Sequence, residues 1–363
     1  MDIQCYDGWF DGGCNIYFSA NNLNALCCYN IESNITKIIG KFDKEFVWQK
    51  YIHNSVIEKD GCLFFLPYRG HGISKFNLKT NEISFVNVCD STKYASFCVP
   101  VVDEQEVYLI PTDLDHISYK YDSGSREFVE DYVLTEKLRK WVEGKTSYCD
   151  LNGCCANNHN IYVSLFNTNK VLQIDLHNDK TNEISLDSAI GIGNIIVFDS
   201  ALWVVSWEGD KCWKCSLDGE LLEEFVLSND TEYRGYQNFI KYYDKLFLLG
   251  CHQDVLSIYD GIKWTQVVLP DEFNRITKWS LFAGAEIINE ELYLLPCAGN
   301  GILKINKNDI VAFLPCYTAD ISQEEAETMV TEEFTYRVNN NEIFKESKDE
   351  YGLKDFLSQI IRM

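Results

Sequence analysis

The sequence has few basic residues for its acidity. Lysine and arginine total 32 against 55 aspartates and glutamates, which gives a formal net charge of −23 at pH 7. Proteins that bind nucleic acid need a stripe of Lys and Arg along the phosphate backbone, and no such stripe is visible. The same acidity is unfavourable at an anionic membrane surface. We therefore expect no nucleic acid partner.

The sequence also lacks a long apolar run. No stretch approaches the length that spans a bilayer, and the opening MDIQCYDGWFDGG has no basic segment followed by an apolar core. We therefore expect no membrane insertion and a cytoplasmic location, where the 15 cysteines would stay reduced. The CxxC pair Cys212 and Cys215 lies on an expected strand, whose alternation turns residues three apart to opposite faces. The sequence thus predicts no metal site and no cofactor, with a bound divalent metal as the alternative.

A repeat of apolar strands organises the chain. Seven times, a strand with a central aromatic residue is followed by a polar turn and a second apolar strand. The seven aromatic anchors are Tyr17, Phe64, Tyr108, Tyr162, Trp203, Phe247 and Tyr293. They stand 41 to 54 residues apart, a period typical of propeller blades. The second strands, such as CLFFLP (62–67) and ALWVVSW (201–207), are almost continuously apolar, as expected of strands buried on both faces.

These units predict an all-β fold, a seven-bladed β-propeller of four-stranded antiparallel blades. First strands are expected at 55–61, 194–200 and 285–291, and fourth strands at 83–88, 183–186, 223–227, 265–269 and 310–314. Residues 1–316 should form the propeller, with residues 1–6 able to pair with the last blade and close the ring. Residues 317–363 should form an acidic tail ending in an amphipathic helix at 351–363.

The longest spacing marks an insertion at 133–148. Its pattern predicts a short helix capped by Thr135, with Leu138 and Trp141 on its apolar face and Gly144 at its end. The insertion should lie on the same face as the turns between second and third strands. It could serve as a lid or docking element, or as a structural plug.

Loop positions counted from the seven anchors form two columns, one with a predicted role in folding and one with a predicted role in recognition. Seven residues past each anchor, six of the seven residues are Asp or Asn, and His71 is the exception. We interpret this column as side chains that bond their own backbone and set the turn. The column five past each anchor is polar but varied, as a binding surface would be. It contains Asn22, Arg69, Asp113, Asn167, Glu208, His252 and Ala298.

The fourth repeat resembles a known class of propeller. The segment NHNIYVSLFNTNKVLQIDL (158–176) is similar to the repeat of NHL and YVTN-type propellers, in which IYV, an Asn-rich turn and a V-x-x-I-D strand recur. The resemblance implies a seven-bladed propeller over roughly 310 residues of this chain. That broad group includes lactonases, a streptogramin lyase and non-catalytic recognition modules. No stretch here matches a metal-binding motif of its metalloenzymes, so the resemblance assigns no catalytic residue.

The sequence favours a non-catalytic recognition or scaffold propeller that binds a glycan, peptide or protein through this loop face. The expected contacts are Arg69, Trp207, Glu208, Arg234, Tyr236 and His252. The alternative is an enzyme, a lyase or hydrolase acting on a small or carbohydrate substrate at the mouth of the channel. Such an enzyme would need at least a histidine for proton transfer with a carboxylate nearby. The candidates are His71 or His252 with Asp113 or Glu208. A purely structural member of an assembly is a third hypothesis.

Overall fold

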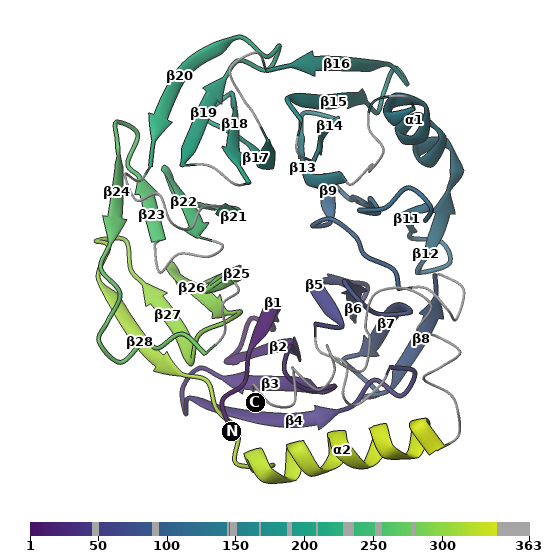
Figure 1. Cartoon of the computed structure of the whole chain (residues 1–363), viewed down its shortest axis with the longest axis vertical. Helices are drawn as coiled ribbons and strands as arrows, with labels where there is room; N and C mark the ends of the chain where they lie inside the picture. Colours follow the sequence, from purple (N-terminus) through teal and green to yellow (C-terminus); the bar gives the residue numbers. More distant parts are fainter. Residues whose placement is uncertain are drawn as a thin grey trace.

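Seven four-stranded antiparallel sheets surround a central axis in the computed structural model (Figure 1). The structure describes residues 1–45, 51–88, 94–143, 145, 151–166, 168–186, 191–207, 210–227, 236–250, 256–276 and 280–339. The strands of blades 1 to 4 are β1 (Cys5–Phe10), β2 (Asn15–Ala20), β3 (Leu26–Asn30), β4 (Ile35–Gly40), β5 (His53–Lys59), β6 (Cys62–Pro67), β7 (Gly72–Asn77), β8 (Ile83–Asn87), β9 (Val101–Asp103), β10 (Glu106–Leu109), β11 (Ser118–Asp122), β12 (Glu127–Asp131), β13 (Leu151–Asn157), β14 (Asn160–Leu165), β15 (Lys170–Asp175) and β16 (Thr181–Ser185). Those of blades 5 to 7 are β17 (Ile192–Phe198), β18 (Ala201–Ser206), β19 (Lys211–Cys215), β20 (Leu221–Val226), β21 (Tyr236–Tyr242), β22 (Lys245–Gly250), β23 (Leu256–Tyr259), β24 (Trp264–Val267), β25 (Phe282–Ile288), β26 (Glu291–Pro296), β27 (Gly301–Ile305) and β28 (Val311–Pro315).

Each blade is a meander whose first strand lies nearest the axis (Figure 1). The predicted seven-bladed propeller is therefore confirmed, and all seven anchors lie in second strands. First strands begin two or three residues earlier than predicted in β5, β17 and β25. In each of these, a β-bulge near the start of the strand extends the pairing with the second strand. The outermost strands β4 and β12 were not predicted, because their alternating or mostly polar sequences carry little apolar signal.

The core lies between the blades. Every residue of β6 and of β18 is buried, which confirms the reading of the apolar second strands. One cluster joins Trp203 of blade 5 to Phe239 and Tyr259 of blade 6. The propeller is thus held together by apolar contact between neighbouring sheets.

Residues from both ends of the ring close it. Asp2 pairs with Tyr317 as an isolated bridge, and the Ile3 amide donates to the Cys316 carbonyl (2.9 Å). The Thr36 amide of β4 donates to the Tyr317 carbonyl (3.1 Å), so the chain after β28 also runs beside the outer strand of blade 1. The predicted role of residues 1–6 in closure is confirmed by these bonds.

The insertion forms α1 (Tyr132–Val142), which packs at the outer side of blades 3 and 4 (Figure 1). Asp131, not Thr135, caps it, since its carboxylate accepts from the Leu134 amide. Thr135 is buried one turn later and accepts from the Ser118 amide (2.8 Å). Leu138 and Trp141 are buried as predicted, which favours the plug over a lid. Gly144 lies outside the described residues.

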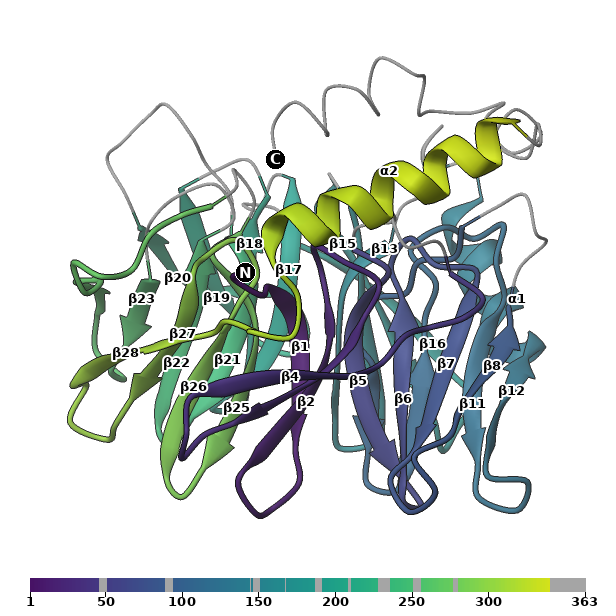
Figure 2. The same ribbon diagram turned by 90° about the horizontal axis from the view of Figure 1, so that it is seen from below.

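A second helix, α2 (Gln323–Asn339), lies in the acidic tail and runs along the outer edge of the ring beside β4, at the level of the upper face (Figures 1 and 2). Here the upper face is the one carrying the turns between second and third strands and the connections between blades. Ser322 and Glu325 form a capping box at its start, with Ser322 N to Glu325 Oε2 at 2.7 Å and Glu325 N to Ser322 Oγ at 3.1 Å. The sequence pattern did not predict this helix. The predicted helix at 351–363 lies outside the described residues, and the proposed boundary at 316/317 stays a prediction.

Polar side chains at the bulges of the innermost strands tie each blade to the next. Asn54 donates to the Phe97 carbonyl (2.7 Å), Asn194 to Asn238 Oδ1 (3.3 Å) and Asn238 to the Ala283 carbonyl (3.1 Å). Asn152 makes the same kind of bond to the Gly193 carbonyl. In blade 1 this place is taken by Asp7, whose carboxylate accepts from the Val56 amide of blade 2 (3.1 Å). An asparagine side chain therefore makes the hydrogen bond to the next blade in four blades, and an aspartate side chain makes it in blade 1.

Candidate recognition site at the upper mouth of the channel

In five of the seven blades, the residue four past the anchor is fixed at the inner rim of the upper face. Its amide donates to the carbonyl just before the innermost strand of its own blade. The bonds are Asn21 to Gln4 (2.7 Å), Tyr68 to Ile52 (2.8 Å), Thr112 to Ser96 (2.9 Å), Trp207 to Gly191 (2.8 Å) and Cys297 to Leu281 (2.9 Å). The column four past the anchor therefore borders the mouth of the channel. The sequence reasoning had chosen the column five past it.

Three tyrosines gather at this rim beside blades 7, 1 and 2. The ring of Tyr6 lies 5.7 Å from that of Tyr51 and 5.4 Å from that of Tyr68, measured between centroids, and both pairs are tilted or edge-on. The Arg69 guanidinium lies 5.6 Å from the centroid of the Tyr68 ring, within range of a cation–π interaction. Cys297 of blade 7 packs in the same cluster. We call Tyr6, Asn21, Tyr51, Tyr68, Arg69 and Cys297 the upper-mouth cluster.

The backbone at Tyr51 is strained. Its φ of +59° lies in the left-handed region, which an aromatic residue adopts at a cost of about 1–3 kcal/mol. The Tyr51 amide donates to the Asn21 carbonyl (3.0 Å), and this bond holds the strained residue between blades 1 and 2. Strain of this kind persists where the position of a side chain matters, and here it brings the Tyr51 ring against Tyr6.

Two buried amides in this region have atoms with no hydrogen-bond partner among the described residues. They are Asn21 Oδ1 and Gln4 Nε2, in side chains of residues only 1% and 3% exposed. The Asn21 amide nitrogen lies 3.7 Å from the Cys297 sulfur, so its oxygen borders the upper-mouth cluster. A buried polar group without a partner costs about 1–3 kcal/mol. A water molecule or a ligand at this point would satisfy both groups.

Two acids stand on the innermost strands just below. Asp7 of β1 and Glu286 of β25 are both partly buried, and these strands are neighbours at the centre of the ring (Figure 1). Burial raises the pKa of Asp7 from 3.8 to about 7, against the lowering effect of amide hydrogen bonds from Val56 and Gly8. Burial, and then the charge of Asp7, raise the pKa of Glu286 from 4.5 to about 8. We call these two residues the channel acid pair.

Of the six predicted contact residues, the structure describes the side chains of two, Arg69 and Trp207. Arg69 lies in the upper-mouth cluster, and Trp207 packs edge-on against Phe166 of the neighbouring blade at 5.4 Å between centroids. Tyr236 is the first residue of β21, and its side chain is outside the described set. Glu208, Arg234 and His252 also lie outside the described residues.

The predicted catalytic residues have separate partners. His71 Nδ1 lies 2.9 Å from Glu45 Oε2, its amide donates to Glu45 Oε1 (2.7 Å), and its ring contacts that of Tyr94 at 4.9 Å. Asp113 is exposed and accepts from the Asp115 amide two residues later (2.9 Å). His71 is thus anchored to the connection between blades 1 and 2, and Asp113 shapes its own loop.

The column seven past the anchor departs from its predicted role. Asn24 donates to the Phe42 (3.0 Å) and Glu45 (2.9 Å) carbonyls, and Asn300 donates to the Glu272 carbonyl (3.1 Å). These side chains hold the connections between blades rather than their own turns. The prediction was wrong at these positions because the partners are close in space but 18 to 28 residues away in sequence.

The sequence reasoning missed one buried histidine, His53. Its Nδ1 lies 2.8 Å from Ser19 Oγ and its Nε2 lies 3.2 Å from Ser74 Oγ, so it joins blades 1 and 2. Burial lowers the pKa of His53 from 6.5 to about 3, and the residue is 2% exposed. The His53 imidazole is neutral, shielded from solvent and in contact with both Ser19 and Ser74. It therefore acts as a structural link between blades 1 and 2.

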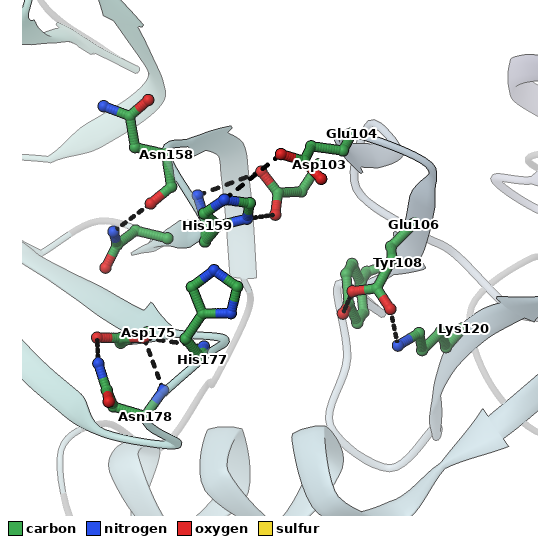
Figure 3. Close-up of polar contacts among 11 residues, drawn as sticks. Asp103, Glu104, Glu106, Tyr108, Lys120, Asn158, His159, Asp175, His177 and Asn178 are labelled. Atoms are coloured by element: carbon green, nitrogen blue, oxygen red, sulfur yellow. Dashed lines mark hydrogen bonds and ion pairs between the residues drawn. The ribbon is translucent and has the colours of Figure 1, made fainter.

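A second polar cluster lies on the lower face, between the turns of blades 3 and 4 (Figure 3). The buried Asp103 carboxylate binds His159 through Nδ1 (3.0 Å) and accepts from its amide (3.3 Å), and Glu104 Oε1 lies 3.5 Å from Nε2. The ring of His177 packs on that of His159 at 4.0 Å between centroids. Similar ties join other blades on this face, as between Tyr121 and Asp60 (2.7 Å). We assign this cluster to the joining of blades.

The described part of the chain contains neither a membrane-spanning helix nor a group of side chains that could hold a metal ion. No helix in it is long and apolar enough to cross a membrane. Within the same residues, no three His, Cys, Asp or Glu side chains are arranged to hold a metal ion.

Comparison with known protein families and with curated proteins finds no match to the sequence. The fold, in contrast, is similar to several solved propellers. YCF48 bound to D1 peptide superposes with a TM-score of 0.59 at 10% identity, over 84% of this chain and 91% of the other. An inactive variant of virginiamycin B lyase from Staphylococcus aureus, solved with quinupristin, gives 0.55 at 14% identity, over 73% and 84%. BamB from Moraxella catarrhalis gives 0.51 at 14% identity, over 81% and 82%.

These likenesses and the ring of seven blades define the chain as a seven-bladed β-propeller repeat protein. Identities of 10% to 14% establish the fold alone. Propellers of this shape include a peptide-bound protein and a lyase, so the function of this chain must be argued from its own residues.

Proposed function

We propose that this protein is a recognition propeller that binds a peptide, or an exposed segment of a partner protein, at the upper-mouth cluster. The observation that carries the proposal is the gathering of Tyr6, Tyr51, Tyr68 and Arg69 at one side of the mouth. Tyrosine and arginine are enriched among residues that contribute most to binding energy. Tyr51, Tyr68 and Arg69 remain partly exposed.

The framework supports binding by a site formed in advance. Tyr51 is held in a strained conformation, and Tyr68 and Arg69 both have amides bonded to the Ile52 carbonyl (2.8 and 3.3 Å). A rigid site loses little conformational entropy when a ligand binds. A peptide suits the three tyrosines and Arg69 better than a sugar does, and a glycan stays a prediction without a supporting contact.

The test uses random 12-residue peptides displayed on phage and selected on the wild-type protein. Peptides that depend on the site should lose binding, by about tenfold or more, to Tyr51→Ala and Arg69→Ala. Tyr132→Ala is the matched control, because Tyr132 is an exposed tyrosine on α1. If no selected peptide distinguishes the two site variants from the wild type, recognition at this cluster is refuted.

The enzyme alternative has less support from the described residues. His71 is held by Glu45, while His252 and Glu208 lie outside the described set. A lyase or hydrolase activity and the cytoplasmic location therefore stay predictions.

A further inference from the structure

We propose that the channel acid pair, Asp7 and Glu286, binds a basic side chain, lysine or arginine, of the peptide recognised at the upper mouth. This inference rests on the proposed function and adds the chemistry of one ligand group to it. It is carried by three observations: both acids depart from the repeat, they have no cationic partner in the described structure, and an unpartnered acceptor borders the upper-mouth cluster.

The first observation comes from comparing blades within the chain. Glu286 pairs with the anchor Tyr293 across β25 and β26. The residues that pair with the other six anchors are Trp9, Ile57, Val101, Cys155, Ile196 and Ile240. Six blades thus have an apolar residue where blade 7 has an acid. Since the apolar residues satisfy the fold, Glu286 is not needed for folding.

Asp7 departs from the repeat in the same way. The tie to the next blade is made by an asparagine in blades 2, 4, 5 and 6, without any charge. Asp7 makes its tie with a carboxylate, whose partner is the neutral Val56 amide (3.1 Å). Gly284 of blade 7 packs against it so closely that a Cβ there would lie 2.5 Å from Asp7 Oδ1. The two departures from the repeat therefore meet at the junction of blades 7 and 1.

The second observation is that the two acids, on the neighbouring strands β1 and β25, have no counter-charge among the described residues. Neither forms an ion pair with any described Lys, Arg or His, although eleven other described acids do. The charge of Asp7 contributes to the raised pKa of Glu286, so the two carboxyls are close enough to interact. A ligand ammonium or guanidinium would supply the missing charge, and the net charge of −23 would attract it.

The third observation is the buried Asn21 Oδ1 without a partner beside the tyrosines. It is an acceptor, as are the two carboxylates, so these three groups fit a donor-rich ligand, whereas the unpartnered Gln4 Nε2 is a donor and takes no part in binding a cation. The rings of Tyr6 and Tyr51 favour an organic cation, because cations bind the faces of aromatic rings. The groups thus fit a lysine or arginine side chain that passes the tyrosines to reach the acids.

The phage selection tests this inference on the same full-length protein. Peptides selected on the wild type are expected to share a Lys or Arg at one fixed position. A synthetic copy of a selected peptide should lose about 10- to 100-fold in affinity when that residue becomes norleucine, measured by isothermal titration. The peptide should lose a similar factor on Glu286→Gln, while Glu104→Gln on the lower face should bind it like the wild type.

The outcomes separate the two proposals. Peptides that need Tyr51 and Arg69 but share no basic residue, or bind Glu286→Gln unchanged, would leave recognition standing and overturn the cation site. Peptides that need Glu286 and a basic residue but not Arg69 would support the cation site and refute the cluster. Because glutamine keeps the size of glutamate and removes a charge that burial disfavours, a melting temperature of Glu286→Gln equal to or above that of the wild type would exclude unfolding as the cause of lost binding.

Discussion

Replacing Asp7 with asparagine should stabilise the protein, and more so at high pH. Asparagine stands at the corresponding place in four other blades, where its amide nitrogen donates to the next blade, and in blade 1 its amide oxygen can accept from the Val56 amide as the carboxylate does. The replacement removes a charge that burial disfavours. The expected gain follows from the raised pKa of Asp7.

The sign and size follow from proton linkage. The unfolded chain releases the proton of Asp7 near pH 3.8, whereas the folded protein keeps it until about pH 7. Stability is therefore fully present below pH 3.8, falls as the pH rises to about 7, and stays lower above that. A tenfold change in an acid dissociation constant is worth about 1.4 kcal/mol. The penalty is thus about 1.6 kcal/mol at pH 5 and at most about 4 kcal/mol at pH 8.5, since Asp7 keeps some contact with solvent.

Thermal unfolding by differential scanning fluorimetry measures this effect. With an unfolding entropy of about 2.1 cal/mol/K per residue, Asp7→Asn should raise the melting temperature by about 2 °C at pH 5 and up to about 5 °C at pH 8.5. Asp113→Asn is the control, because Asp113 is exposed and asparagine keeps its turn. A gain that is equal at both pH values, or a lower melting temperature at pH 8.5, would refute the reasoning.

Three further results are expected. Gly284→Ala should lower the stability by about 1–3 kcal/mol, because its Cβ would lie 2.6 Å from the Tyr6 carbonyl oxygen, whereas Gly124→Ala meets nothing closer than 3.4 Å and should change little in urea unfolding. Asp131→Ala removes the cap of α1 and should cost about 1 kcal/mol in the same assay; an unchanged midpoint would show that the cap contributes nothing. Iodoacetamide at pH 8, read by peptide mass mapping, should leave the native buried thiols unmodified, and labelling of them before unfolding would contradict the described burial. These thiols are Cys5, Cys27, Cys62, Cys98, Cys154, Cys212, Cys215, Cys297 and Cys316.

Much of the fold could be predicted from the sequence because its signals are local. Strand periodicity and turn residues act over a few positions, and their recurrence every 41 to 54 residues defined the blades. Boundaries failed where a distant partner decides them. The first strands began early at β-bulges, and α1 is capped by Asp131 because that residue ends β12 at the start of the helix.

The site was predicted only in part for the same reason. Arg69 was found because it is a charged residue in a loop column, which is a local feature. Tyr6, Tyr51 and Tyr68 come from three different parts of the chain, and Tyr6 is 8% exposed, so no sequence pattern joins them. The column four past the anchor became visible as the inner rim through its bonds to residues 16 or 17 positions earlier.

The sequence by itself determined that the chain repeats a four-stranded unit seven times, because hydrophobic alternation and turns are encoded within each unit. Only the tertiary structure decided which departures from that repeat meet. Ring closure brings blade 7 against blade 1, and so places Glu286 near Asp7 although 279 residues of chain separate them in the numbering. Proximity of this kind depends on the curvature of the whole ring, which no local pattern encodes.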